Sequence, residues 1–336
     1  RHERMKYLAK YISEFNKATV LIIGDIIADH YIWGKVERIS PEAPVPIVDV
    51  QRESFMLGGA GNVANNIHSL EGKVRICGVV GDDDMGRWVT GNLRSIGINT
   101  DGIIVEEGRP TSKKTRVIAH NQHVVRFDHE SRGEISLQTQ DLMLDYIRTH
   151  INDIKVVVLS DYAKGVVTRN LVKNVLQSAL EYNICIVVDP KLKHFDYYTG
   201  ATVITPNTSE ASAASGITIT DKESLYKAGN ILLSQANAEA VLITRSEHGM
   251  SLFEKKGDIT HIPAVARDVY DVTGAGDTVV STLALAIAAG ASLKDAARLA
   301  NYAGGIVVGI VGTATVHQDN LITAITDSVE TQAHTG

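Results

Sequence analysis

Short apolar runs alternate along this chain with stretches that have the periodicity of helices. The runs are strand-like, and several end in a polar residue: 19–24, 74–80, 155–160, 184–189, 202–205 and 240–244. The intervening segments predict helices near 61–71, 84–96, 136–149, 168–182, 221–236 and 275–290. Such alternation is typical of βαβ units, so we expect an α/β protein with a mainly parallel sheet covered on both faces. Ligands of such sheets bind beyond the carboxyl ends of the strands.

Two segments, 31–52 and 111–128, interrupt this pattern with apolar residues at every second position. Pro41, Pro44 and Pro46 exclude a helix from the first segment. We expect both to form a small antiparallel sheet, or lid, that projects from one domain spanning 1–330, with a frayed end at 331–336. The apolar face of such a sheet needs a cover. A substrate cleft and a second subunit are the two candidates, and we expect a homodimer through the lid strands.

The charge balance excludes several classes of partner. Lys and Arg number 33 against 39 Asp and Glu, a net charge of −6 at pH 7, which argues against nucleic-acid and anionic-membrane binding. The most apolar stretch, 278–293, contains Thr, Ser and Gly and falls short of the ~18 uninterrupted apolar residues of a membrane span. It predicts a core helix. Cys77 and Cys185 lie in apolar runs and predict buried thiols in a reducing, cytoplasmic setting.

The most informative motif is Asp-Val-Thr-Gly-Ala-Gly-Asp at 271–277, directly before an apolar helix. Gly274, Ala275 and Gly276 permit a tight turn whose N–H groups point outward, and the helix start adds its positive end. Together they predict an anion hole for a phosphate or for a developing oxyanion. Asp277 stands at the same helix start and could take a proton from an alcohol held there. The alternative is a Gly-rich loop with an ordinary helix-capping Asp.

A second glycine-rich run, Gly-Gly-Ala-Gly-Asn-Val-Ala at 58–64, has two interpretations. Its spacing matches a dinucleotide-binding fingerprint, but the Pro-rich segment upstream is not the first strand of a βαβ unit. We favour a glycine pair, Gly58 and Gly59, that lets a sugar approach the backbone, with Asn62 binding its hydroxyls.

Two carboxylates, Asp25 and Asp29, follow the first predicted strand. Their spacing suits hydrogen bonding to neighbouring sugar hydroxyls, and carboxylates at the start of a helix are an equal alternative.

Two further segments lie where a nucleotide could bind. Asn207 and Glu210 follow the run 202–205; Glu210 could hold a metal ion through water and Asn207 could contact phosphate, while a plain helix cap is the alternative. The strand end and turn at 244–249 could contact a nucleotide. The sequence contains no P-loop motif, so any nucleotide site is of another type.

Cations gather around the predicted sugar cleft although the chain is acidic. Alternation places Lys114 and Arg116 on one face of their strand and Lys113 on the other, and Lys164 and Lys191 follow two sheet strands. We expect Lys114, Arg116, Lys164 and Lys191 to hold a phosphate that the substrate already carries. Solvated surface charge is the alternative for part of this set.

These motifs, in this order, resemble the signatures of the ribokinase-like (PfkB) carbohydrate kinases. The resemblance implies a three-layer α/β sandwich with a mainly parallel sheet and a small antiparallel β lid, and it implies ATP and Mg²⁺ as cofactors. By position it implies Asp277 as the catalytic base with Gly274, Ala275 and Gly276 as the anion hole. The remaining implied contacts are Asp25, Asp29, Gly58, Gly59 and Asn62 for sugar hydroxyls; Asn207, Thr208, Ser209 and Glu210 for ATP and Mg²⁺; and Thr244, Arg245, Ser246, Glu247 and Gly249 for the nucleotide.

The resemblance therefore implies an ATP-dependent kinase acting on a sugar phosphate. Three alternatives stay open from the residues alone. They are a kinase for another sugar, a sugar-sensing module without catalysis, and a dinucleotide-dependent dehydrogenase.

Overall fold

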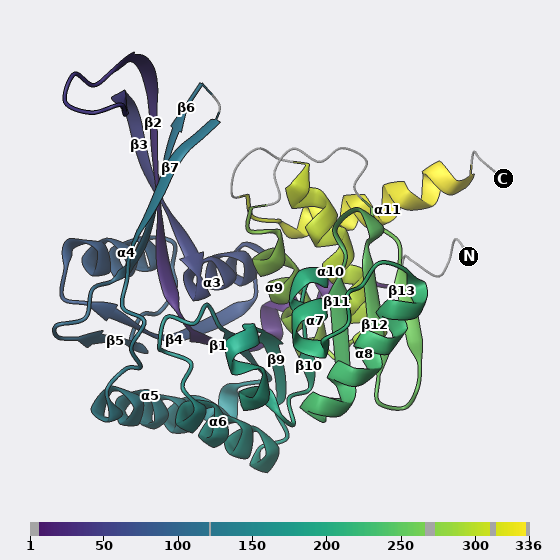
Figure 1. Ribbon diagram of the computed structural model, residues 1–336. Helices are drawn as coiled ribbons and strands as arrows, with labels where there is room; N and C mark the ends of the chain where they lie inside the picture. The colour runs from purple at the N-terminus through teal and green to yellow at the C-terminus, as the bar shows by residue number, and fades with distance from the viewer. Residues whose placement is uncertain (1–6, 121, 266–272, 310–313, 334–336) are drawn as a thin grey trace.

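A nine-stranded sheet runs through the molecule (Figure 1). The computed structural model describes residues 7–120, 122–265, 273–309 and 314–333, with side chains as far as 326. Seven strands are parallel, in the order β5 (Ile103–Glu106), β4 (Lys73–Gly81), β1 (Thr19–Gly24), β8 (Val156–Ser160), β9 (Cys185–Asp189), β10 (Val203–Ile204) and β11 (Ala240–Thr244). Two antiparallel strands, β12 (Met250–Glu254) and β13 (Ile259–Ile262), complete one edge.

Helices cover both faces of this sheet, as the alternation predicted. One face carries α2 (Ala9–Ile12), α3 (Ala60–Ser69), α9 (Ala275–Ala288), α10 (Leu293–Val308) and α11 (Gln318–Ala333). The other carries α5 (Leu137–His150), α6 (Arg169–Glu181), α7 (Thr208–Ser215) and α8 (Lys222–Ala236). Helix α4 (Asp84–Ser95) adds Val89 and Leu93 to the core of the first face. The remaining short elements are η1 (Phe15–Lys17), η2 (Ile151–Asp153), η3 (Leu192–Tyr198) and η4 (Ser246–His248). The predicted three-layer arrangement is confirmed.

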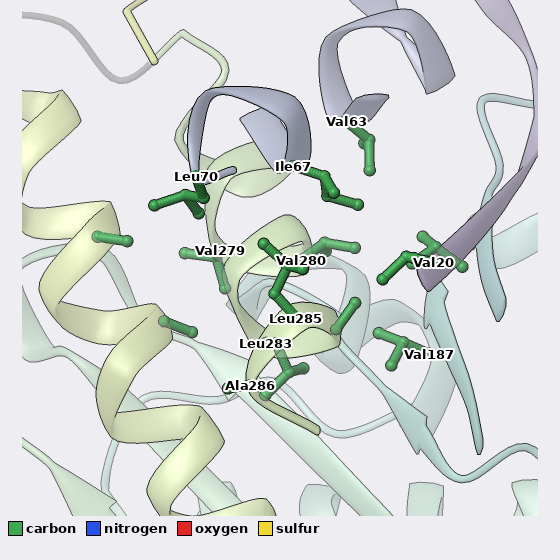
Figure 2. Packing of buried hydrophobic residues seen from close by; sticks show 14 of the residues in the cluster. Val20, Val63, Ile67, Leu70, Val187, Val279, Val280, Leu283, Leu285 and Ala286 are labelled. Atoms are coloured by element: carbon green, nitrogen blue, oxygen red, sulfur yellow. The ribbon is translucent and has the colours of Figure 1, made fainter. Parts of the chain in front are cut away.

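The buried strands alternate between the two apolar layers. In β1, Val20 and Ile22 pack with the helices of one face, and Leu21 and Ile23 with those of the other. A sheet covered on both sides needs apolar residues at every position, which explains the continuous runs. Helix α9 is buried along most of its length and packs against α3 and the sheet (Figure 2). The core-helix interpretation of this stretch is confirmed, and no helix of the described residues is long and apolar enough to cross a membrane.

The lid is a separate four-stranded sheet that projects from the rest of the molecule (Figure 1). It consists of β2 (Ile26–Ile39), β3 (Pro46–Gly59), β6 (Ser112–Ala119) and β7 (Gln122–His129), in the order β3-β2-β6-β7. The two hairpins are antiparallel, and they join through a parallel pair, β2 with β6. The first lid hairpin is longer than the predicted segment 31–52, because β2 begins directly after β1 and β3 continues to the start of α3. The second hairpin agrees with the predicted segment 111–128 to within one residue.

At the C-terminal end of the described residues, helix α11 extends to Ala333. The fraying of 331–336 stays a prediction. Leu321 and Ile325 anchor the helix in the core, and residues 334–336 lie outside the described part. The short strands β5, β12 and β13 and the helices α7, α10 and α11 were not predicted.

Candidate active site

The carboxylate of Asp277 lies at the start of α9, in the first helical turn after a left-handed Gly274 (φ 78°). The side chain is buried, with 6% of its surface exposed. Asn62 Nδ2 donates to Asp277 Oδ2 at 2.6 Å, and the Tyr162 hydroxyl donates to Asp277 Oδ1 at 2.8 Å. Residues far apart in the sequence thus aim one carboxylate into the space beyond the strand ends.

Burial sets the acidity of this group. The pKa of Asp277 is raised from 3.8 to about 6. Loss of water is the largest cause and the charge of Asp29 adds to it, while the bonds from Asn62 and Tyr162 and the charge of Lys114 oppose the rise. A carboxylate with this pKa is ionised at neutral pH, and its proton affinity suits a general base.

The predicted anion hole lies beside this carboxylate. Gly274, Ala275 and Gly276 begin α9, where the first N–H groups of a helix have no partner within the helix. A Cβ atom placed on Gly276 would meet nothing within 4 Å, so the space in front of the turn is open. The preceding Asp271 of the motif lies outside the described residues.

The sugar-side residues meet at the junction of the lid and the sheet. Asp29 lies in β2, so the alternative of a helix-start carboxylate is wrong. A Cβ atom on Gly58 would lie 2.3 Å from Asp29 Oδ2, and one on Gly59 (φ 53°) would lie 2.3 Å from the Asp25 carbonyl oxygen. The glycine pair therefore makes room for this neighbouring chain, a reason the sequence did not reveal. Arg116 Nη1 lies 2.5 Å from Asp29 Oδ1.

Asp25 makes different contacts from those expected. Its carboxylate accepts backbone N–H bonds from Tyr162 (2.7 Å), Lys164 (3.2 Å) and Val166 (3.1 Å), and only 1% of the residue is exposed. Burial and the charge of Asp161 raise the pKa of Asp25 to about 6, against these bonds. Asp25 thus anchors the loop after β8, and its role in binding sugar hydroxyls stays a prediction.

The four predicted cations separate into two groups. Lys114 and Arg116 share one face of β6, as the alternation predicted: Arg116 reaches Asp29, and Lys114 Nζ lies 5.1 Å from the centre of the Tyr162 ring. Lys164 pairs with Glu130 at 2.7 Å. Lys191 instead pairs with Glu210 at 3.1 Å, on the predicted nucleotide side.

The two predicted nucleotide segments lie together. Asn207 caps α7: its Oδ1 accepts from the Glu210 N–H at 2.9 Å, and Glu210 Oε2 accepts from the Asn207 N–H at 3.1 Å. The alternative of a helix cap is therefore realised, while Glu210 Oε1 faces Lys191. Thr208 Oγ1 donates to the Thr244 carbonyl oxygen at 3.2 Å. These segments, with Gly276, line a cavity of about 170 Å³.

The other residues of these segments lie farther from that cavity. Arg245 Nη1 donates to Ser251 Oγ at 3.3 Å, and Gly249 (φ 76°) closes the turn by accepting from the Arg245 N–H at 2.8 Å. Ser209, Ser246 and Glu247 are exposed.

Five residues that line the cavity were not predicted, and two of them, Tyr162 and Asp189, carry ionisable side chains. Burial raises the pKa of Asp189 well above its ordinary value, and the neighbouring Asp277 and Glu210 add to this while Lys191 opposes it. Asp189 ends strand β9, so the rule that ligands meet strand ends could have singled it out. No group of three or more His, Cys, Asp or Glu side chains within the described ranges could hold a metal alone. The carboxyl groups of Asp189 and Glu210, which both line this cavity, nevertheless suit Mg²⁺, because this ion keeps several waters and shares its ligands with phosphates.

Comparison with known proteins agrees with this geometry. Residues 17–320 match the pfkB family carbohydrate kinase profile. The chain belongs to the pfkB family of carbohydrate kinases. It is therefore a sugar kinase, and the family implies ATP as the phosphoryl donor.

Curated relatives of this kinase carry a second part. The chain is 50% identical over 302 residues to "Bifunctional protein HldE" of Geobacter sulfurreducens, which covers 90% of this chain and 62% of that protein. It is 48% identical over 316 residues to the protein of that name in Citrifermentans bemidjiense, covering 93% and 65%. The chain thus spans somewhat less than two thirds of the length of these relatives.

Solved structures share the fold of this kinase. Phosphofructokinase-2 from Escherichia coli in complex with substrates and products matches with a TM-score of 0.76 at 18% identity, covering 93% of this chain and 99% of that one. Ribokinase from Arabidopsis thaliana, complexed with ribose and ATP, matches with a TM-score of 0.73 at 17% identity, covering 92% and 98%.

Proposed function

We propose that this kinase transfers the γ-phosphoryl group of ATP to the anomeric hydroxyl of D-glycero-β-D-manno-heptose 7-phosphate. The product is the 1,7-bisphosphate, a precursor of ADP-heptose and of the lipopolysaccharide core. The sequences at 38–46, 160–165 and 189–191 resemble the kinase that performs this step, and the HldE relatives support the assignment. The observation that carries the proposal is the buried Asp277 carboxylate at the start of α9, near enough to Asp29 and Lys114 of the lid for their charges to shift its pKa.

The chemistry follows from the placement of the groups. Asp277 takes the proton of the anomeric hydroxyl while the oxygen of that hydroxyl forms a bond to the γ-phosphorus of ATP. The bond from the γ-phosphorus to the oxygen that bridges it to the β-phosphorus breaks, and ADP is released. The N–H groups at Gly274–Gly276 stabilise the charge on the transferring group. Asp29 and Asn62 orient the sugar, and positioning supplies much of the rate because the transition state is loose.

ATP and Mg²⁺ occupy the other side of the base in this proposal. The segments at Asn207–Glu210 and Thr244–Gly249 hold the nucleotide, and Glu210 holds Mg²⁺. When bound, Mg²⁺ neutralises charge on the phosphates. Lys191, paired with Glu210, belongs to this side by its contacts.

Lys114 is the cation best placed for the substrate's own phosphate. Within the described ranges no carboxylate lies within 4.0 Å of its Nζ, whereas Arg116, Lys164 and Lys191 are all paired. Burial lowers the pKa of Lys114, and the charges of Lys164, Arg126 and Arg116 add to this while Asp29 opposes it. A dianionic phosphate would relieve this repulsion through charge-assisted hydrogen bonds.

We further propose a homodimer through the lid. Val125 and Phe127 of β7 are about half exposed, at 49% and 53%, and Val50 of β3 is 48% exposed. Aligned apolar side chains on a projecting sheet favour contact with a second copy of the chain.

The decisive experiment for the substrate is ADP release with a panel of acceptors. Heptose 7-phosphate is expected to exceed free heptose, fructose 6-phosphate and ribose in kcat/KM. Loss of the remote phosphate should lower kcat as well as raise KM, because binding energy there aligns the reacting hydroxyl. Equal kcat/KM for heptose and its 7-phosphate would refute the phosphate clamp, and preference for another acceptor would refute the heptose assignment.

A further inference from the structure

Tyr162 lies at the meeting point of the catalytic groups, although the mechanism above assigns it no role. Its hydroxyl donates to Asp277 Oδ1 at 2.8 Å, and its backbone N–H donates to Asp25 Oδ2 at 2.7 Å. Burial raises the pKa of the Tyr162 phenol well above its ordinary value, and the charges of Asp277 and Asp189 raise it further. The phenol is therefore protonated at neutral pH and acts as a donor.

The ring of Tyr162 carries two ammonium groups from different parts of the chain. Lys114 Nζ, from the lid, lies 5.1 Å from the ring centre, and Lys191 Nζ, beside Glu210, lies 5.4 Å from it. Both are within the ~6 Å at which a cation is attracted to an aromatic face.

We propose that Tyr162 is a positioning residue of this kinase, whose phenol holds the Asp277 carboxylate in its reactive orientation while its ring holds Lys114 and Lys191 beside it. The inference rests on the proposed function, because Asp277 is taken as the base. Each carboxylate oxygen has two lone pairs. Asp277 therefore keeps acceptor capacity for a substrate hydroxyl while Asn62 and Tyr162 each occupy one position.

The position of Tyr162 is itself fixed by the loop that carries it. Asp25 accepts from the N–H groups of Tyr162, Lys164 and Val166, and Arg109 donates to the carbonyl oxygens of Lys164 and Gly133 from the other side. Two side chains, Asp25 and Arg109, thus hold the backbone of the loop, so the phenol meets Asp277 without being ordered at the moment of reaction. This assigns Asp25 a role at a distance from the substrate.

Two substitutions separate the hydroxyl from the ring. Tyr162→Phe keeps the ring and removes the donor, so both KM values should stay within about threefold of wild type while kcat falls about tenfold. Because the lost bond favours the ionised carboxylate, the acidic limb of the kcat/KM profile should move upward by about one pH unit, a tenfold change in ionisation. Tyr162→Leu removes the ring as well, and KM should then rise for both substrates.

Tyr7→Phe is the matched control. It removes a phenol that donates to another carboxylate, that of Asp295 in α10, and it should leave the acidic limb in place. An unchanged kcat and acidic limb in Tyr162→Phe would overturn the positioning role and leave Tyr162 as loop packing.

A second measurement does not require activity. Thermal unfolding of wild type and Tyr162→Phe is compared at pH 5 and pH 8. The loss of stability should be larger at pH 8, where Asp277 is ionised, and in an Asp277→Asn background this dependence on pH should disappear. An equal loss at both pH values would overturn the inference. If the wild type phosphorylates no sugar, the proposed function fails, while the unfolding data still decide the contact of Tyr162 with Asp277.

Discussion

Replacing Asp277 by asparagine removes a negative charge from a buried site while keeping the shape of the side chain. We expect the Asp277→Asn protein to fold and to bind both substrates, because Asn62 and Tyr162 still face an amide of the same size. Turnover should fall ~10²–10⁴-fold, the usual cost of losing a general base. The same change should have a second effect, on the pH dependence of stability.

The size of this effect follows from the pKa of the folded carboxyl group. Its value is about 6 in place of 3.8, so folding is penalised when Asp277 is ionised. The penalty is fully present above pH 6 and is lost as the pH falls from 6 to below 4. At 1.36 kcal/mol for each tenfold step, it is about 3 kcal/mol at pH 7.5 and about 1 kcal/mol at pH 4.5. Asparagine carries no such penalty at either pH.

Urea unfolding of the two proteins at both pH values measures this difference. The free energy of unfolding of Asp277→Asn, relative to wild type, should be about 2 kcal/mol more favourable at pH 7.5 than at pH 4.5. The free-energy cost of the altered hydrogen bonds in Asp277→Asn is mainly independent of pH, so it cancels when the two pH values are compared. Asp25, whose pKa is also raised, is present in both proteins, so its titration cancels as well. A relative stability that stays level or falls with pH would refute the argument that burial tunes this base, and a loss in kcat below tenfold would remove Asp277 from the role.

Two further predictions concern the lid. Gly58→Ala places a Cβ atom 2.3 Å from Asp29 Oδ2, so it should raise KM for the sugar phosphate but not for ATP, and it should cost ~1–3 kcal/mol of stability. Steady-state kinetics and urea unfolding measure the two effects, and Gly91→Ala in α4, where a Cβ atom meets nothing within 4 Å, is the control. An unchanged KM for the sugar phosphate would contradict the contact. The double substitution Val125→Asp and Phe127→Asp should convert the dimer to a monomer, as measured by light scattering. Leu180→Asp, at a residue that is 84% exposed on α6, is the control and should leave the dimer intact. A monomeric wild type at micromolar concentration would show that the lids of two copies do not pair.

The sequence predicted the layers of the fold because the signals for them are local. Buried parallel strands such as β11 are continuous apolar runs, and its predicted bounds, 240–244, agree with the structure. The antiparallel strands β12 and β13 lack such a signal, since their apolar runs are shorter and are interrupted by polar residues. Helix α10 was overlooked because its apolar face is made of small residues, among them Ala296, Ala297, Ala300 and Ala303.

The sequence predicted which residues belong to the candidate site better than it predicted the contacts that those residues make. Asp277 and Asn62 were singled out from separate motifs, and the structure joins them through a hydrogen bond across 215 positions of sequence. Asp25 was expected to face a sugar, yet its partners are backbone groups 137 to 141 positions away. No local pattern encodes such a pairing. Tyr162 was not singled out as a site residue either, because an aromatic residue after a strand is ordinarily a packing residue.

The late position of α9 in the chain has a consequence for synthesis of the protein on the ribosome. This helix covers Val20 of β1 and Val63 and Ile67 of α3 (Figure 2), yet residues 275–288 are translated after all the strands of the described sheet. Until they emerge, only α2, α3 and α4 can cover this face of the nascent sheet, and the incomplete domain exposes apolar surface to chaperones and to other chains. The same helix contains Asp277. Synthesis of α9 therefore supplies the proposed catalytic base and the cover of the core together, and a chain interrupted before α9 lacks both.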